Sequence, residues 1–212
     1  MIDLYTWATP NGRKISIMLE ECELPYDVKL INIREKEQFE PAFLKISPNN
    51  RIPAIVDPDG PGGKPIALME SAAILIYLAD KTGKFLAPEG ESRYRQLEWA
   101  MWQMGNIGPM IGQLSHFINS APEQIPYAVG RYLDETVRLL RILDDRLGEV
   151  DYVGGEYSIA DMLIYPWVKP ALARLIDMKG DEFGGGKNIL RWFAQLEDRP
   201  ALQKGMNVPA SD

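Results

Sequence analysis

Cysteine and histidine are nearly missing from this chain of 212 residues, which contains one of each. A single cysteine excludes an intramolecular disulfide and any Cys-x-x-Cys pair. Structural and catalytic zinc sites are assembled from several cysteine and histidine side chains, and the sequence offers no such set. We therefore expect no bound metal.

Positive charge is also in short supply, because 23 lysines and arginines face 30 aspartates and glutamates, for a net charge of −7. An acidic chain without a basic stripe is a poor ligand for nucleic acid. No apolar run approaches the roughly 20 residues that a membrane-spanning helix needs, and the opening Met1–Asp3 lacks the basic segment of a signal peptide. These absences predict a cytoplasmic protein that binds neither nucleic acid nor a membrane.

What is present divides the chain in two. Residues 1–81 alternate between strand and helix patterns and predict a mixed sheet with helices on both faces. Residues 82–91 contain turn formers and predict a linker. Residues 92–212 carry no strand signal and predict an all-helical domain with a loose tail after Pro200. The expected class is therefore α/β plus all-α.

The segment Ser47–Asp57 holds a proline at the entrance of a short apolar strand, Ala54–Val56. Proline cannot donate to a sheet ladder, so Pro53 fits the first residue of a strand. A cis Ile52–Pro53 bond would turn the N–H and C=O groups of Ile52 outward, where an extended peptide could pair with them. This segment alone favours the trans bond, because most X-Pro bonds are trans.

A second segment, Leu68–Leu78, runs from an apolar strand through Glu70 and Ser71 into a helix. The free N–H groups at a helix N-terminus bind a carboxylate, and a serine hydroxyl adds one more donor. Serine is also a common helix cap without any ligand. Because Glu70 could meet an ammonium group, the two segments together suit a small peptide that carries an amine and a carboxylate at one end.

These two segments resemble the thioredoxin-fold half of a glutathione transferase. The opening Met1–Gly12 with its Thr-Pro-Asn signature, together with Ser47–Asn50, is similar to the branch that contains the bacterial Nu-class disulfide-bond oxidoreductases and a fungal prion-forming nitrogen regulator. The likeness extends from residue 1 to about residue 200. It implies an N-terminal thioredoxin-like domain and a C-terminal helical bundle.

The resemblance implies which residues meet glutathione. Thr9 and Asn11 would lie nearest the sulfur and serve as the catalytic residues, while Tyr5 is the competing donor used by many other transferases. The remaining glutathione-binding residues implied are Asn11, Gln38, Ile52, Glu70, Ser71 and Arg131. Arg131 would act across a homodimer interface, although Gly130 stands where the family usually has an acidic residue.

The activity implied is that of a glutathione-dependent disulfide-bond oxidoreductase that takes small disulfides and also peroxides or electrophiles. Glutathione would be the cosubstrate, with no metal. Conjugation by a Tyr5-type transferase and a non-catalytic glutathione-binding regulatory module are the alternatives, since fold alone does not fix function.

Two further residue patterns are expected to serve folding and not chemistry. Cys22 falls on the apolar face of the first helix and is expected to be an inert core residue, because reactive thiols need exposure and a cationic neighbour. Ser158 with Asp161 three residues later resembles a capping box at the start of a helix.

Overall fold

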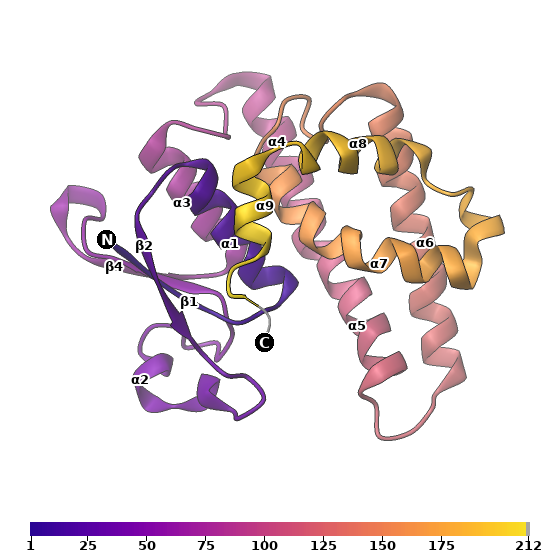
Figure 1. Ribbon diagram of the computed structural model, residues 1–212, viewed down its shortest axis with the longest axis horizontal. Helices are drawn as coiled ribbons and strands as arrows, with labels where there is room; N and C mark the ends of the chain where they lie inside the picture. Colours follow the sequence, from indigo (N-terminus) through magenta and orange to yellow (C-terminus); the bar gives the residue numbers. More distant parts are fainter. Residues whose placement is uncertain (211–212) are drawn as a thin grey trace. The chain divides into compact units, whose positions relative to one another are not determined.

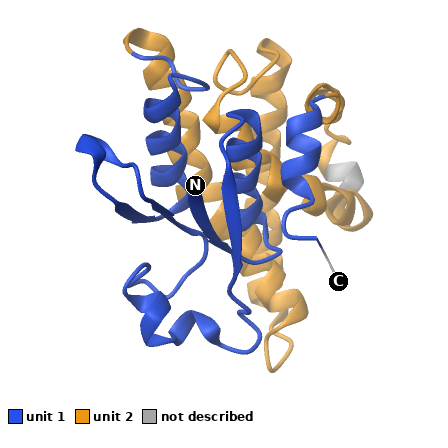
Figure 2. Ribbon diagram, turned by 60° about the vertical axis from the view of Figure 1, so that its left-hand side comes forward, with its two compact units in different colours: residues 1–88, 199–212 blue, residues 89–198 orange. Residues whose placement is uncertain are grey.

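The computed structural model describes residues 1–210, leaving out the side chains of residues 180–182. The chain forms two compact units, the first made of residues 1–88 and 199–212 and the second of residues 89–198 (Figure 2). In the described residues, no helix is both long enough and apolar enough to span a bilayer.

The first unit is built on a four-stranded sheet in the order β2-β1-β3-β4. Strand β1 pairs parallel with β2 and antiparallel with β3, and β3 pairs antiparallel with β4. The bounds are β1 Ile2–Thr6, β2 Tyr26–Leu30, β3 Ala54–Asp57 and β4 Ile66–Met69. This is the mixed sheet that the alternating pattern predicted.

Helices cover both faces of this sheet (Figure 1). Helices α1 (Pro10–Glu21) and α3 (Ser71–Thr82) pack together on one face, and the short α2 (Pro41–Leu44) lies on the other. The single-turn segments η1 (Glu37–Phe39) and η2 (Pro61–Gly63) belong to the connections. The predicted thioredoxin-like class of this part is confirmed.

The C-terminal segment differs from the expected loose tail. Residues 200–206 form helix α9 (Pro200–Met206), which packs along α1 and therefore belongs to the first unit and not to a domain of residues 92–212. Ser16 donates a hydrogen bond to the carbonyl of Gly205 at 2.6 Å. A Cβ on Gly205 would lie 2.5 Å from the Cα of Ile17, so only glycine permits this approach. The sequence signal was missed because the helix has seven residues and its burial depends on a distant partner.

The second unit is helical throughout its described elements. They are α4 (Gly90–Trp102), η3 (Gln103–Ile107), α5 (Gly108–Asn119), α6 (Pro126–Glu149), α7 (Ile159–Phe183) and α8 (Lys187–Glu197). The interruption expected from Gly105, Gly108 and Pro109 is present as the π-helical turn η3.

Asp161 organises the start of α7, as the capping pattern predicted. Its carboxylate accepts hydrogen bonds from the backbone N–H groups of Val153 and Ser158, at 3.0 and 3.1 Å, and from the indole N–H of Trp192 at 2.9 Å. Burial raises the pKa of Asp161 to about 6, and the three hydrogen bonds act against that rise. Because the carboxylate and Ser158 are fully buried, this is an internal structural device.

Candidate functional site

The sheet register brings four chain segments to one end of the first unit. Thr6, the last residue of β1, pairs with Leu30, the last residue of β2. Ala54, the first residue of β3, pairs with Tyr5 and with Met69, the last residue of β4. The segments that leave β1, β2 and β4 and the segment that enters β3 therefore meet at the same sheet end, which carries most of the residues singled out in the sequence.

The first of these segments is the turn between β1 and α1. Thr9 is the N-cap of α1, and its hydroxyl oxygen accepts a hydrogen bond from the N–H of Gly12 at 3.2 Å. Accepting through a lone pair leaves a hydroxyl with its own proton to donate. Pro10 and the half-buried Asn11 follow as the first helical residues. The turn is tight, because a Cβ on Gly12 would lie 2.3 Å from the hydroxyl oxygen of Thr6.

Tyr5 projects from β1 toward α2. Its ring centroid lies 6.1 Å from that of Phe43, and it lines a cavity of about 370 Å³ with residues of α2 and of the chain between β2 and α2. Alternation along the strand places Tyr5 on the opposite face from its buried neighbours Leu4 and Thr6. The structure thus gives Tyr5 a packing partner, while Thr9 sits at the start of the helix.

The second segment is the loop that enters β3. The buried hydroxyl of Ser47 donates to the carbonyl of Arg51 at 2.8 Å, and Asn50 adopts a left-handed conformation with φ of 47°. The Ile52–Pro53 bond is cis. The trans bond favoured by this segment alone is therefore wrong; the trans preference of an X-Pro amide is only about 0.5–1 kcal/mol, so the surrounding fold decides.

The third segment joins β4 to α3. Glu70 is exposed and has φ of 70° and ψ of 111°, a backbone conformation that few residues other than glycine adopt. Such conformations cost roughly 1–3 kcal/mol and concentrate at functional sites. Glu70 is the N-cap of α3 but makes no side-chain capping hydrogen bond. The next residue, Ser71, is buried.

Lys14 lies behind this helix start and was not singled out in the sequence. Its side chain is fully buried, and its Nζ donates to the hydroxyl oxygen of Ser71 at 3.3 Å. Burial lowers the pKa of Lys14 to about 7, and the nearby Glu70 carboxylate opposes part of that fall. A signal was available, because Lys14, Ile17 and Met18 fall at i, i+3 and i+4 on one face of α1, where a lysine among apolar residues is out of place.

Gln38 is half-buried in η1, in the segment that leaves β2. Its side-chain oxygen is buried and has no hydrogen-bond partner among the described residues. Buried polar atoms are satisfied in most cases, so this one suits a ligand that brings a donor.

Arg131 does not belong to this group, because it is an exposed residue of α6 in the second unit. It lines a hollow of about 850 Å³ whose other residues include Tyr127, Glu135 and Arg138. Glu135 and Arg138 form an ion pair at 2.7 Å.

Cys22 lies in the core, as expected. Its thiol is 3.5 Å from the hydroxyl of Thr82 and 4.0 Å from the sulfur of Met18. Burial raises the pKa of the Cys22 thiol, so the thiolate is disfavoured. No cluster of residues suited to holding a metal occurs within the part of the chain that the structure describes.

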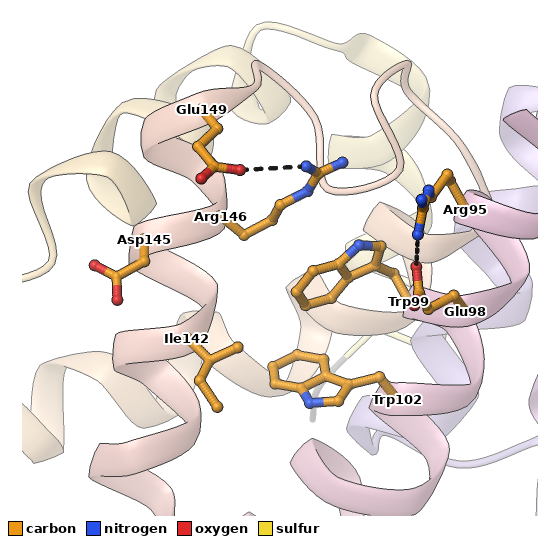
Figure 3. Close-up of a pocket in the computed structure, with 8 residues that line it drawn as sticks. All are labelled: Arg95, Glu98, Trp99, Trp102, Ile142, Asp145, Arg146 and Glu149. Carbon is orange, nitrogen blue, oxygen red and sulfur yellow. Dashed lines mark hydrogen bonds and ion pairs between the residues drawn. The ribbon is translucent and has the colours of Figure 1, made fainter.

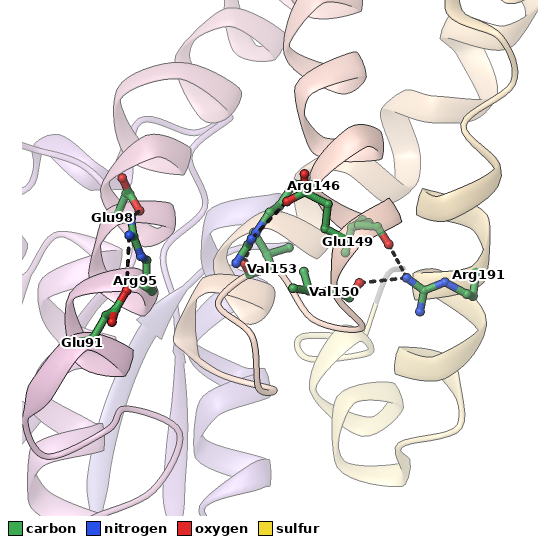
Figure 4. Close-up of polar contacts among 9 residues, drawn as sticks. Glu91, Arg95, Glu98, Arg146, Glu149, Val150, Val153 and Arg191 are labelled. Atoms are coloured by element: carbon green, nitrogen blue, oxygen red, sulfur yellow. Dashed lines mark hydrogen bonds and ion pairs between the residues drawn. The ribbon is translucent and has the colours of Figure 1, made fainter.

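A separate cavity of about 640 Å³ lies in the second unit between α4 and α6 (Figure 3). Trp99 and Trp102 form its apolar wall, and the guanidinium of Arg146 lies 5.7 Å from the ring centre of Trp99. Both arginines around it have partners, and Arg146 pairs with Glu149 at 3.5 Å. Arg95 bonds to Glu91 and Glu98, and Arg146 donates to the carbonyl of Val153 (Figure 4).

Known proteins resemble this chain both in its N-terminal part and over nearly its whole length. The N-terminal domain model of glutathione S-transferases matches residues 8–81. The disulfide-bond oxidoreductase YfcG of Escherichia coli K12 is 48% identical over 208 residues, covering 97% of this chain and 94% of that protein.

Two solved structures are also similar over nearly the whole chain. A glutathione transferase from Pseudomonas putida, with one glutathione disulfide bound per subunit, has a TM-score of 0.93 and 43% identity, covering 99% of this chain and 92% of that one. A family member from Pseudomonas fluorescens Pf-5, with two glutathione bound, has a TM-score of 0.90 and 45% identity, covering 97% and 92%.

The fold and the sheet-end site together define a thioredoxin-like domain and a helical unit, with the N-terminus of α3 and the loop of the cis Ile52–Pro53 bond at the same sheet end. The chain belongs to the glutathione S-transferase family.

Proposed function

We propose that this protein is a glutathione-dependent disulfide-bond oxidoreductase, as the name of its Escherichia coli relative indicates for that protein. The observation that carries the proposal is the gathering of peptide-binding groups at one sheet end, while the chain's one cysteine is buried in the core. A reactive thiol must then come from the ligand.

In this proposal the γ-glutamyl end of glutathione binds at the start of α3. Glu70 meets its ammonium group, and Ser71 with the first N–H groups of α3 meets its carboxylate. The outward-turned backbone of Ile52 pairs with the cysteinyl residue. The unsatisfied side-chain oxygen of Gln38 supports a place for the glycine end, whose N–H group is a donor.

The sulfur is then assigned to Thr9 and Asn11. A free cysteine thiol has a pKa of about 8.5, and one pKa unit corresponds to about 1.36 kcal/mol. One hydrogen bond to a charged group contributes about 1.5–3 kcal/mol, so a single donor at the first turn lowers the thiol pKa enough for a useful thiolate fraction near pH 7. Thr9 is suited to this because its oxygen caps α1 through a lone pair.

The reaction proposed is thiol–disulfide exchange. The glutathione thiolate attacks one sulfur of a small disulfide, the S–S bond breaks, and the other half leaves as a thiolate that takes up a proton. A second glutathione thiolate resolves the mixed disulfide, giving glutathione disulfide and the second free thiol. The same thiolate would reduce peroxides and add to electrophiles.

The test is disulfide reduction with reduced glutathione and 2-hydroxyethyl disulfide by three variants. Thr9→Ala should lower kcat/KM by one to two powers of ten, matching the loss of about 1.5–3 kcal/mol of hydrogen bonding to charged sulfur. Thr9→Ser keeps both the cap and the donor and should stay close to wild type. Loss of activity in Tyr5→Phe with retention in Thr9→Ala would transfer the role to Tyr5 and favour the conjugating transferase.

A regulatory module would bind but not react. Calorimetric titration with reduced and oxidised glutathione, followed by the same disulfide assay, separates the two. Tight binding without turnover would contradict the enzyme. Chelator treatment should leave turnover unchanged, since the proposed chemistry needs no metal.

We propose further that the protein is a homodimer and works in the cytoplasm. Tyr94 and Met101 are 72% and 48% exposed and lie seven residues apart on one face of α4, which supports an interface there. Arg131 would contact glutathione across that dimer. Light scattering of wild type and Met101→Asp tests the dimer, and a cytoplasmic site supplies the reduced glutathione that the reaction consumes.

A further inference from the structure

The buried amine of Lys14 has no place in the binding scheme above. Lys14 lies in the second turn of α1, is fully buried, and reaches the hydroxyl oxygen of Ser71 at 3.3 Å. Lysine is seldom fully buried, because taking an ammonium out of water is costly. Because burying the Lys14 ammonium costs free energy, we expect this group to serve a function.

Within the part of the chain that the structure describes, the Glu70 carboxylate is a charge that acts on the pKa of Lys14. Lys204 of helix α9 and Arg199, which precedes it, pair with carboxylates in the last turn of α1 and so at its other end. Strand β1 presents Asp3, which lies 3.8 Å from Lys29. Helix α3 presents Lys81, which pairs with Asp57 at 2.8 Å.

An ammonium group has protons to donate and no lone pair. The hydroxyl oxygen of Ser71 therefore faces Lys14 with a lone pair, and its proton is directed elsewhere. The start of α3 adds backbone N–H groups on the outer side, so the amine and the helix terminus favour an anion at the same point.

We propose that Lys14 is a positioning residue for the γ-glutamyl subsite: by donating to Ser71 it holds that hydroxyl as a donor toward the α-carboxylate of glutathione, and its charge adds to the attraction. The inference rests on the proposed function, because it presupposes that glutathione binds at the start of α3. It makes affinity for the peptide depend on the protonation of a residue that does not touch it.

A specific pH dependence follows. Burial lowers the pKa of Lys14 to about 7 in the free protein. A bound carboxylate favours the ammonium form, so binding above that pH is linked to proton uptake. Affinity should therefore fall as the pH rises through 7, in the same range in which free glutathione begins to form its thiolate.

The experiment is calorimetric titration of the full-length protein with S-methylglutathione, whose blocked sulfur removes the thiol from the pH dependence. Wild type should lose about tenfold in affinity between about pH 5.5 and about pH 8, the change expected when a group with a pKa near 7 must be protonated. Lys14→Met should bind at least about tenfold more weakly at the lower pH and vary less with pH. The exposed Lys64, on the connection between β3 and β4, provides Lys64→Met as the matched control, which should behave as wild type.

Lys14→Gln is the second variant, since an amide donates to Ser71 without a charge. It should bind with intermediate affinity and without the Lys14 pH dependence. In a double-mutant cycle, Ser71→Ala with Lys14→Met should lose less than the sum of the two single losses. If Lys14→Met does not fold, proton uptake by wild type at about pH 8, measured in buffers of different ionisation enthalpy, decides the matter.

Equal affinity and equal pH dependence in wild type and Lys14→Met would overturn the inference and leave the proposed function intact. Zero proton uptake by wild type would do the same. Failure of wild type to bind S-methylglutathione at any pH would instead overturn the proposed function, and the inference with it.

Discussion

Two helices of this protein begin beside a buried serine that contacts a buried charged side chain, and they differ in what is left for a ligand. At α7, Ser158 and the neighbouring N–H groups bond to Asp161, a carboxylate supplied by the same helix. At α3, Ser71 contacts Lys14, a cation supplied by another helix. At α7 the charged partner of the serine is an anion, whereas at α3 it is a cation.

The N-cap residues sharpen the contrast. Glu70 bends through a backbone conformation rare for its residue type and makes no side-chain capping bond to α3. Ser158 does cap α7, accepting from the N–H of Ala160 at 3.3 Å. We therefore expect a serine at a helix start to serve ligand binding only where the fold does not provide the carboxylate itself.

The largest effect should follow from removing the internal anion. Asp161→Ala leaves the N–H groups of Val153, Ser158 and Trp192 buried without their acceptor, at about 1–3 kcal/mol for each unsatisfied group. We expect the free energy of unfolding of the second unit to drop by more than about 3 kcal/mol in urea. Asp161→Asn, which keeps one acceptor, should lose less. Equal stability of Asp161→Ala and wild type would contradict a structural role.

Removing the buried cation should have the opposite sign. Taking an ammonium out of water costs several kcal/mol, so Lys14→Met should be more stable than wild type at about pH 6, by roughly 1–4 kcal/mol. The pKa of Lys14 is lowered from 10.5 in the unfolded chain to about 7 in the folded one. Between these values the unfolded state binds more protons, so wild-type stability rises with pH and the advantage of Lys14→Met shrinks. Urea melts at several pH values measure this, and a constant difference would argue against a buried ammonium.

The two serines should separate stability from affinity. Ser158→Ala should lower the free energy of unfolding by about 0.5–2 kcal/mol, the usual cost of a lost cap, and leave glutathione affinity unchanged in the folded protein. Ser71→Ala should weaken glutathione binding by about 1.5–3 kcal/mol, the range for a hydrogen bond to a charged group, with a smaller change in stability. Urea melts and calorimetry on both variants measure this. A loss of affinity in Ser158→Ala, or a loss of stability alone in Ser71→Ala, would contradict the comparison.

The smallest effect concerns the bend before α3. Glu70→Gly relieves an unfavourable φ and should raise the free energy of unfolding by about 1 kcal/mol, near the lower end of the cost of such conformations. It should also weaken glutathione binding, because the carboxylate for the ammonium is gone. Glu70→Gln keeps the bend and separates the charge from the strain. A less stable Glu70→Gly would show that the bend is not strained.

The features that depend on local sequence patterns could be predicted from the sequence. Proline and glycine positions marked the turn at Thr9 and the interruption in the helix after residue 92, and the apolar spacing placed Cys22 in the core. What failed depended on distant partners. The polar residues Lys14 and Ser16 are buried because α3 and α9 pack against α1. The cis bond at Pro53 was not predicted, because most X-Pro bonds taken alone are trans.

The docking of α9 against α1 also sets an order of events during synthesis. The helix that begins at Thr9 is made among the first residues, yet one of its walls arrives only with residues 200–206. Until that stretch has emerged from the ribosome, Ser16 and Ile17 stay exposed to solvent and to chaperones. The packing around α1 is thus completed last although the first turn of this helix is translated first, and a chain stalled before Pro200 should be recognised by quality control as incomplete.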